Sequence, residues 1–169
     1  MEEKRKGSEK KVMVVIDESD DSYYALIWLL DNLKELVAKS SVTIFATQPF
    51  PSCGSAQIGF AHFFAPFATN PELIYSILQQ RQNITLSLCE KAKSFCARRG
   101  VKVEAFTEAG DPKEIVRDAV HKQGTDLLVM ANYPSNPFKR VFVETLSEYC
   151  LKNAKCPVLL VEPKSVNIM

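Results

Sequence analysis

The sequence predicts an open α/β fold: one parallel sheet of five strands with helices on both faces. Short apolar runs alternate with longer segments of helical spacing from Lys11 to the end of the chain. The first run, Val12-Met13-Val14-Val15-Ile16, is continuous, as expected of a strand that is buried on both faces. Strands joined by helical crossovers lie parallel, so this alternation indicates a doubly wound sheet. A length of 169 residues with 46% apolar side chains suits a single domain with a substantial core.

The first half of the chain predicts two strands, a helix and a long loop. Ser19 to Ser22 can cap a helix after the first strand, and apolar residues at helical spacing continue that helix to Val37. Residues 41–47 form the second strand. Residues 49–70 are rich in Pro, Gly, Ser and Phe, which predicts a long aromatic loop. Such a loop suggests a lid or a protein-interaction surface, and a flap packed over the core is the alternative.

The second half continues the alternation. Asn70-Pro71 opens a long helix that ends at Gly100, and Gly110-Asp111-Pro112 opens a shorter one that ends before Gly124. A last helix reaches toward Asn153. The three remaining strands are predicted at 101–106, 126–130 and 156–161.

Charge and composition exclude several classes of function. The net charge is +1, from 21 basic and 20 acidic side chains, so no basic footprint for nucleic acid or an anionic membrane is present. The first apolar run begins only at Val12, which predicts no secretory signal, and no run approaches the roughly 20 apolar residues of a membrane span. The five cysteines contain no C-x-x-C pair, which favours free thiols in a reducing cytoplasm.

The most informative segment follows the fourth predicted strand, from Met130 to Ser147. In an open α/β sheet this strand-to-helix turn is where a phosphate usually docks. A phosphate loop needs glycines, because backbone N–H groups must approach the anion without a Cβ in the way. This segment has no glycine, and Pro134, Pro137 and Glu144 stand within it. The chain therefore has the strand-to-helix arrangement of a nucleotide site, but the loop that would bind the phosphates is altered.

Several motifs in order make the chain resemble the universal stress protein family from Lys11 to Pro163. They are Val15-Ile16-Asp17-Glu18-Ser19, Gly110-Asp111-Pro112, Asp126-Leu127-Leu128-Val129-Met130, Ser147-Glu148-Tyr149-Cys150 and Ala154-Lys155-Cys156-Pro157-Val158-Leu159-Leu160-Val161. The last motif is most similar to small single-domain members from plants. The resemblance implies a flavodoxin-like, adenine nucleotide α-hydrolase-like sheet with strand order 3-2-1-4-5. It also implies a domain over 11–163, with a solvated, flexible tail over 1–10 and a short tail over 164–169.

The family divides into nucleotide binders and members that do not bind. Binders have a G-x2-G-x9-G-[ST] pattern after the fourth strand, and in register its glycines fall on Ala131, Pro134 and Glu144. All three are lost, whereas the hydroxyl position remains as Thr145. Proline removes a donor and fixes φ, and a carboxylate at residue 144 would repel a triphosphate. We therefore expect ATP binding to be weak or absent.

The resemblance marks six residues as candidates for nucleotide contact: Asp17, Ala46, Met130, Asn132, Thr145 and Ser147. Asp17 would lie beside adenine and ribose, and its alternative role is to hold the turn after the first strand. Ala46 and Met130 would line the adenine pocket, the latter partly through its backbone, or else pack in the core. Thr145 and Ser147 could donate to an anion or serve as ordinary hydroxyls at a helix start. Asn132 replaces a frequent serine.

These features predict a regulatory or protective protein that is not an enzyme. The resemblance implies a cytoplasmic homodimer through the last strand, near Val158–Val161, where unpaired edge groups could meet a symmetric partner. No cofactor is expected, although ATP or AMP remains a candidate ligand. The alternative is an adenine-nucleotide switch that tolerates AMP or another ligand of low charge. A hydrolase is disfavoured, since Asp17-Glu18-Ser19-Asp20 replaces the Ser-Gly-Gly loop of ATP pyrophosphatases.

Overall fold

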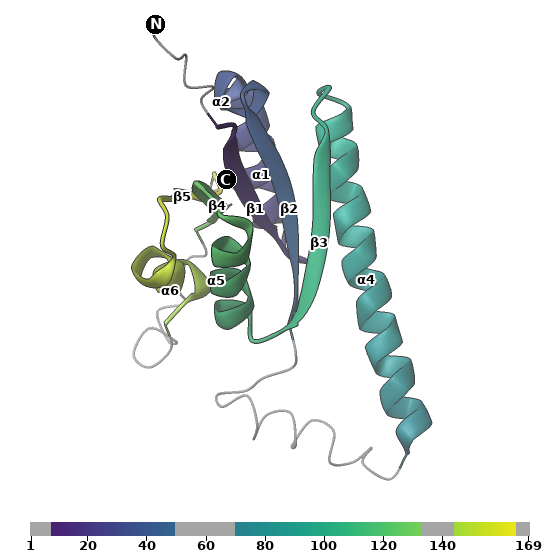
Figure 1. Cartoon of the computed structure of the whole chain (residues 1–169). Helices are drawn as coiled ribbons and strands as arrows, with labels where there is room; N and C mark the ends of the chain where they lie inside the picture. Colours follow the sequence, from purple (N-terminus) through teal and green to yellow (C-terminus); the bar gives the residue numbers. More distant parts are fainter. Residues whose placement is uncertain (1–7, 50–69, 133–143, 165–169) are drawn as a thin grey trace, which may run out of the picture.

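A computed structural model describes residues 8–49, 70–132 and 144–164, which form one parallel sheet between two layers of helices (Figure 1). The strands run in the order β3-β2-β1-β4-β5 and all neighbouring pairs are parallel, so the predicted fold class and strand order are confirmed. The strands are β1 (Lys10–Ile16), β2 (Ser40–Pro49), β3 (Val103–Gly110), β4 (Leu127–Ala131) and β5 (Val158–Val161). The helices are α1 (Asp20–Asn32), α2 (Lys34–Ala38), α4 (Pro71–Ala97), α5 (Pro112–Gln123) and α6 (Leu146–Asn153).

Alternation along the strands divides the core between the two faces of the sheet. In β1, Val12, Val14 and Ile16 belong to the core that α1 and α4 cover, whereas Met13 and Val15 belong to the core under α5 and α6. Every one of these five side chains is at most 2% exposed. A central strand that is apolar on both faces is the pattern expected for a doubly wound sheet.

Short polar side chains begin four of the helices. They are Ser19, Asn70, Asp111 and Thr145, and each accepts a hydrogen bond from a backbone N–H in the first turn of its helix. This satisfies donors that have no partner within the helix. Helix α5 ends at Gly124, whose φ of 62° is the left-handed conformation that glycine adopts readily. The predicted starts at Ser19, Asn70 and Asp111 and the predicted end at Gly124 are thus confirmed.

Several boundaries differ from the prediction: β1 begins at Lys10 instead of Val12, β5 begins at Val158 instead of 156, and three larger differences follow. The helix expected to continue to Val37 breaks at Leu33, whose ψ of 44° is not helical, and α2 starts again at Lys34. Strand β3 covers 103–110, where 101–106 was predicted. Strand β2 extends to Pro49, which was assigned to the loop, because its last three residues pair with Glu108 to Gly110. Residues beyond Ala46 have no β1 partner, and proline is tolerated at such a strand end.

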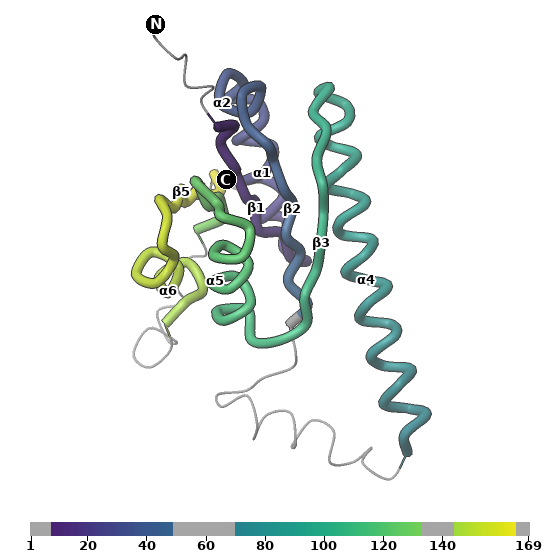
Figure 2. The backbone as a smooth tube through the Cα atoms, in the orientation of Figure 1, coloured from purple at the N-terminus to yellow at the C-terminus, as the bar shows by residue number. Residues whose placement is uncertain are grey.

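Helix α4 is longer than the sheet it covers. Figure 2 shows its amino-terminal half extending beyond the ends of the strands. Among the described residues, four of the five exposed large apolar side chains lie in α4: Leu73, Tyr75, Ile84 and Leu86. Within the described residues, no helix is long and apolar enough to cross a membrane.

Candidate functional site

The order of the strands places the topological switch point of the sheet, where a ligand crevice is expected, between β1 and β4. The chain leaves β1 toward one side of the sheet and β4 toward the other, and ligands of open α/β sheets bind outside the carboxyl ends of such a strand pair. Val14, opposite Val129, is the last residue of β1 that pairs with β4, and Asp17 and Asn132 each follow three residues later at the carboxyl ends of these strands. The topology therefore places these two predicted residues, which are distant in the sequence, at the same end of two neighbouring strands.

Asp17 closes the turn between β1 and α1. Its Oδ1 accepts hydrogen bonds from the backbone N–H of Ser19, at 2.8 Å, and from the Ser19 hydroxyl. Ser22 is fully buried, and its hydroxyl donates to the Ser19 carbonyl at 2.9 Å while accepting from the Asp17 N–H at 3.2 Å. The carboxylate thus has the turn-holding role that sequence offered as the alternative. Contact with a nucleotide stays a prediction for this residue.

Ala46 and Met130 lie on opposite faces of the sheet. Ala46 pairs with Ile16, which belongs to the core under α1 and α4, and Met130 belongs to the core under α5 and α6. Their exposed fractions are 0% and 1%. Since paired residues of adjacent strands point to the same face, the two side chains cannot line one pocket. Only the backbone of Met130 is available to a ligand on the face of Ala46.

Asn132 is held by the last strand and the residue after it. Its N–H donates to the Val161 carbonyl at 2.9 Å, and its side-chain amide donates to Glu162 Oε1 at 3.2 Å. The residue is half-buried at the edge of the crevice. The amide oxygen remains as an acceptor for a ligand.

Thr145 and Glu148 cap α6 reciprocally. The Thr145 N–H donates to Glu148 Oε2 at 3.0 Å, and the Glu148 N–H donates to Thr145 Oγ1 at 3.2 Å. Ser147 is 1% exposed and its hydroxyl lies 3.1 Å from Thr145 Oγ1. Both hydroxyls that were candidates for an anion are therefore engaged within the helix start.

Glu144 lies immediately before this cap and pairs with the other end of α6. Lys152 Nζ donates to Glu144 Oε1 at 2.8 Å. This hydrogen bond lowers the pKa of Glu144, and the charges of Lys152 and Lys113 act in the same direction, whereas desolvation opposes them. The same hydrogen bond raises the pKa of Lys152. Glu144 is therefore a carboxylate at neutral pH.

Sequence reasoning did not identify three residues that shape this site: Ser22 as the closure of the first turn, Glu148 as the reciprocal cap and Lys152 as the partner of Glu144. The spacing Thr145-x-x-Glu148 is the standard capping-box signal and could have revealed the second. Lys152 lies eight residues from Glu144, which matches no helical pairing rule, because Glu144 precedes the helix. Pro134, Pro137 and the aromatic segment 50–69 fall outside the described residues.

The parallel strand order β3-β2-β1-β4-β5, with helices on both faces of the sheet, is that of the adenine nucleotide α-hydrolase-like fold. The model of the universal stress protein family matches residues 9–162. The chain belongs to this family, as the resemblance implied.

Two curated relatives agree with this assignment. A universal stress protein A-like protein from Arabidopsis thaliana is 33% identical over 93 residues, which are 55% of this chain and 53% of the relative. The chain therefore spans about half the length of that protein. A universal stress protein from Methanocaldococcus jannaschii is 27% identical over 154 residues, 90% of this chain and 82% of the relative.

Solved structures share the fold at lower identity. A universal stress protein family protein from Arabidopsis thaliana with AMP bound superposes with a TM-score of 0.60 at 22% identity, covering 92% of this chain and 93% of that one. A universal stress protein in complex with cAMP gives a TM-score of 0.57 at 19% identity, covering 90% and 95%. At these identities the comparison establishes the common fold.

Proposed function

We propose that this chain is a regulatory or protective member of the universal stress protein family that is not an enzyme and binds ATP weakly or not at all. The observation that supports this is the state of the α6 amino terminus. Its side-chain hydroxyls and two of its backbone donors are already bonded, and the ionised Glu144 stands before it.

The physical argument concerns donors and charge. A phosphate at a helix start is stabilised by free N–H groups and by the helix dipole. Here the Thr145 and Glu148 N–H groups are satisfied by the chain itself. The dipole is already matched by the carboxylate of Glu148, and Glu144, although paired with Lys152, adds a second carboxylate nearby, so a triphosphate would meet like charge.

An adenine nucleotide of lower charge is the second candidate ligand. Asp17 and Asn132 both lie at the carboxyl ends of the neighbouring strands β1 and β4, where the predicted nucleotide site would be. Related structures contain AMP or cAMP, which bear fewer negative charges than ATP. A switch that responds to such a ligand would use the crevice without the α6 cradle.

The deciding experiment is calorimetric titration of Mg-ATP and, separately, AMP into nucleotide-free protein. We expect ATP to bind far more weakly than AMP or not to bind. Binding of neither ligand would support the interaction protein over the switch. Micromolar ATP binding would contradict the proposal and make the nucleotide switch the leading function.

A charge-removing variant tests the mechanism. Replacing Glu144→Gln is expected to strengthen ATP binding about fivefold, which corresponds to roughly 1 kcal/mol of relieved repulsion. The control is Glu35→Gln on α2, which makes the same change in net charge at the far end of the sheet. Because the pKa of Glu144 is lowered, this side chain stays ionised when the pH is changed around neutrality. A change of pH therefore cannot remove its charge, and the variant is needed. Equal effects of both variants would show that the location of Glu144 is irrelevant.

We also propose that two copies associate through the free edge of β5. The terminal position of β5 in the sheet supports this, since the backbone N–H and C=O groups on its outer side can pair with the same strand of a second copy. A cytoplasmic location and a further protein partner remain predictions from the sequence.

A further inference from the structure

A groove of about 610 Å³ lies at the amino-terminal edge of the sheet, opposite the crevice between β1 and β4. Its walls are the end of α1, helix α2, the first residue of β2 and the turn from α4 into β3. The last three lie at the top of the view in Figure 1. This volume is in the range of small-molecule sites.

The floor of the groove is aliphatic. Leu30 and Val37 are 3% and 5% exposed, and Val101 completes the apolar lining between them and the start of β3. Among the residues described as lining it, none is aromatic. The surface therefore suits a hydrocarbon chain better than a planar base, which usually stacks on an aromatic ring.

The rim has a surplus of positive charge. Lys34 and Lys102 are exposed, and neither forms a hydrogen bond or ion pair within the part of the chain that the structure describes, although Lys34 interacts electrostatically with Asp31. Asp31 is the one acidic side chain named in the lining, and Arg99 binds it through Nε at 2.7 Å and Nη2 at 3.2 Å. Because this pair neutralises Asp31, the two lysines are left for an anion.

Ser40 supplies an unpaired polar group in the wall. Its Oγ is buried with no hydrogen-bond partner in the described structure. A buried hydroxyl without a partner costs free energy, and such groups need an explanation. A ligand oxygen in the groove would give it an acceptor after rotation about χ1.

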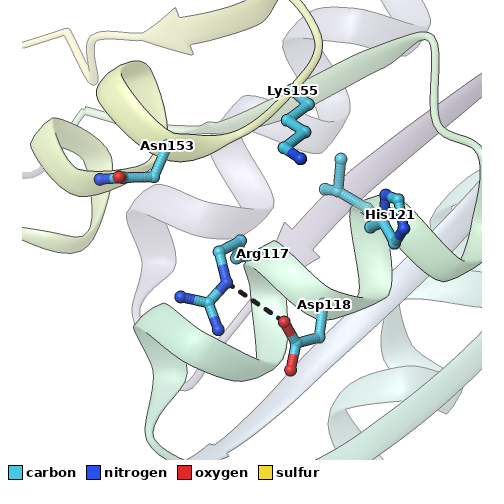
Figure 3. A pocket seen from close by; sticks show the side chains of 6 residues that line it. Arg117, Asp118, His121, Asn153 and Lys155 are labelled. Atoms are coloured by element: carbon cyan, nitrogen blue, oxygen red, sulfur yellow. Dashed lines mark hydrogen bonds and ion pairs between the residues drawn. The ribbon is translucent and has the colours of Figure 1, made fainter.

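A second cavity, between α5 and the end of α6, lacks these properties. It measures about 230 Å³, and Figure 3 shows Arg117 joined to Asp118 on its wall, with Asn153 and Lys155 above them. Arg117 also donates to the Tyr149 hydroxyl at 2.9 Å. The Arg117 guanidinium is thus already hydrogen-bonded to Asp118 and Tyr149. This cavity also has less than half the volume of the groove.

We propose that the groove beside Lys34 and Lys102 binds a small organic anion with an aliphatic tail, of the class of medium-chain carboxylates. The carboxylate lies against the two ammonium groups, and the tail covers Leu30, Val37 and Val101. Charge complementarity selects an anion, and the aliphatic floor selects the tail.

Decanoate, used below its aggregation concentration, is the probe. Amide chemical shifts of isotope-labelled protein are followed during titration, with calorimetry for stoichiometry. We expect saturable one-to-one binding with the largest shifts at Ser40, Gly100 and Val101. Decanol and decyltrimethylammonium, which keep the tail and lose the negative charge, should bind at least tenfold more weakly. Shifts confined to other residues, or equal binding of the three amphiphiles, would overturn the proposal.

Matched variants distinguish direct contact of the two lysines with decanoate from a general effect of positive charge on the protein surface. The double variant Lys34→Ala, Lys102→Ala should lose about tenfold in decanoate affinity, since two exposed charge contacts disappear. Lys39→Ala is the control, because Lys39 follows α2 directly but is outside the groove lining. Equal losses in both proteins would contradict a specific site. Excess AMP should leave decanoate bound, and displacement by AMP would place decanoate at the β1–β4 crevice instead.

Discussion

At the scale of single residues, the start of α6 shows how one hydroxyl can belong to a ligand site or to the fold. Thr145 occupies the position that contacts the ligand in nucleotide-binding relatives, as the resemblance implies. Here its Oγ1 accepts from the Glu148 N–H, and Glu148 returns the bond to the Thr145 N–H. Both partners are satisfied locally, so the cap stabilises the helix without a bound anion.

Removal of this cap should destabilise the protein. Thr145→Ala is expected to lower the free energy of unfolding by about 1 kcal/mol, because the Glu148 N–H in the first turn of α6 loses its partner. Chemical denaturation monitored by circular dichroism measures the change. Thr145→Ser keeps the hydroxyl and should stay within a few tenths of 1 kcal/mol of the parent.

A double-mutant cycle with Glu148→Ala tests reciprocity. If the box acts as a unit, the double variant should lose less than the sum of the two single losses. Strict additivity would mean that Thr145 and Glu148 stabilise α6 independently.

At the scale of elements, β5 is the short strand at one end of the sheet, and no other described strand pairs with its outer side. Leu128 N–H donates to the Pro157 carbonyl and Asn132 N–H to the Val161 carbonyl. In a parallel ladder with this register, residues 157, 159 and 161 face β4, so the backbone groups of Val158 and Leu160 face outward. These outward groups are what a second copy would bind.

Blocking one outward donor should dissociate the proposed dimer. Val158→Pro removes an N–H that β4 does not use, and proline is compatible with a strand edge. Light scattering after size-exclusion chromatography should give a monomer for this variant and a dimer for the parent. Val158→Ala is the control, because it shortens the side chain and keeps the N–H. A Val158→Pro protein that remains dimeric would exclude pairing through β5.

At the scale of the whole molecule, the cysteines and one tyrosine belong to the two cores. Cys96 lies with Tyr23 in the core under α1 and α4, and Cys150 lies in the core under α5 and α6. Burial raises the pKa of Cys96 and Cys150 to about 11 each, and burial, with nearby charges, raises that of Tyr23 to about 12. Because the four described cysteines are free and three of them are buried, their role here is packing.

These pKa values predict loss of stability in alkali. The folded protein favours the neutral thiols and phenol more than the unfolded chain does, so their contribution is complete below about pH 9 and declines as pH rises toward 11 to 12. Urea unfolding at about pH 8 and about pH 10.5 should show the decline. Cys96→Ala should flatten the pH dependence even though it lowers stability overall. Equal stability of the parent at both pH values would contradict the prediction.

Local pattern alone supplied most of the secondary structure. Apolar runs and short polar caps are properties of neighbouring residues, so strands and the starts at Ser19, Asn70 and Asp111 could be predicted. The break at Leu33 could not, because the apolar spacing continues through it and only the packing of α2 against the core decides the bend. The length of β2 was likewise missed, since Pro49 is a strand residue only through its pairing with Gly110.

The candidate site divides in the same way. The residue types were visible in the chain: Asp17 after a strand, no glycine between 130 and 147, and a carboxylate at 144. Tertiary structure decided that Asp17 and Asn132 follow neighbouring strands at the same end of the sheet, that Ala46 and Met130 face opposite sides, and that Lys152 holds Glu144. Residue identity and short-range spacing can be read directly from the sequence. Contacts between distant segments depend on strand register and on which face of the sheet each helix covers, so only the tertiary structure decides them.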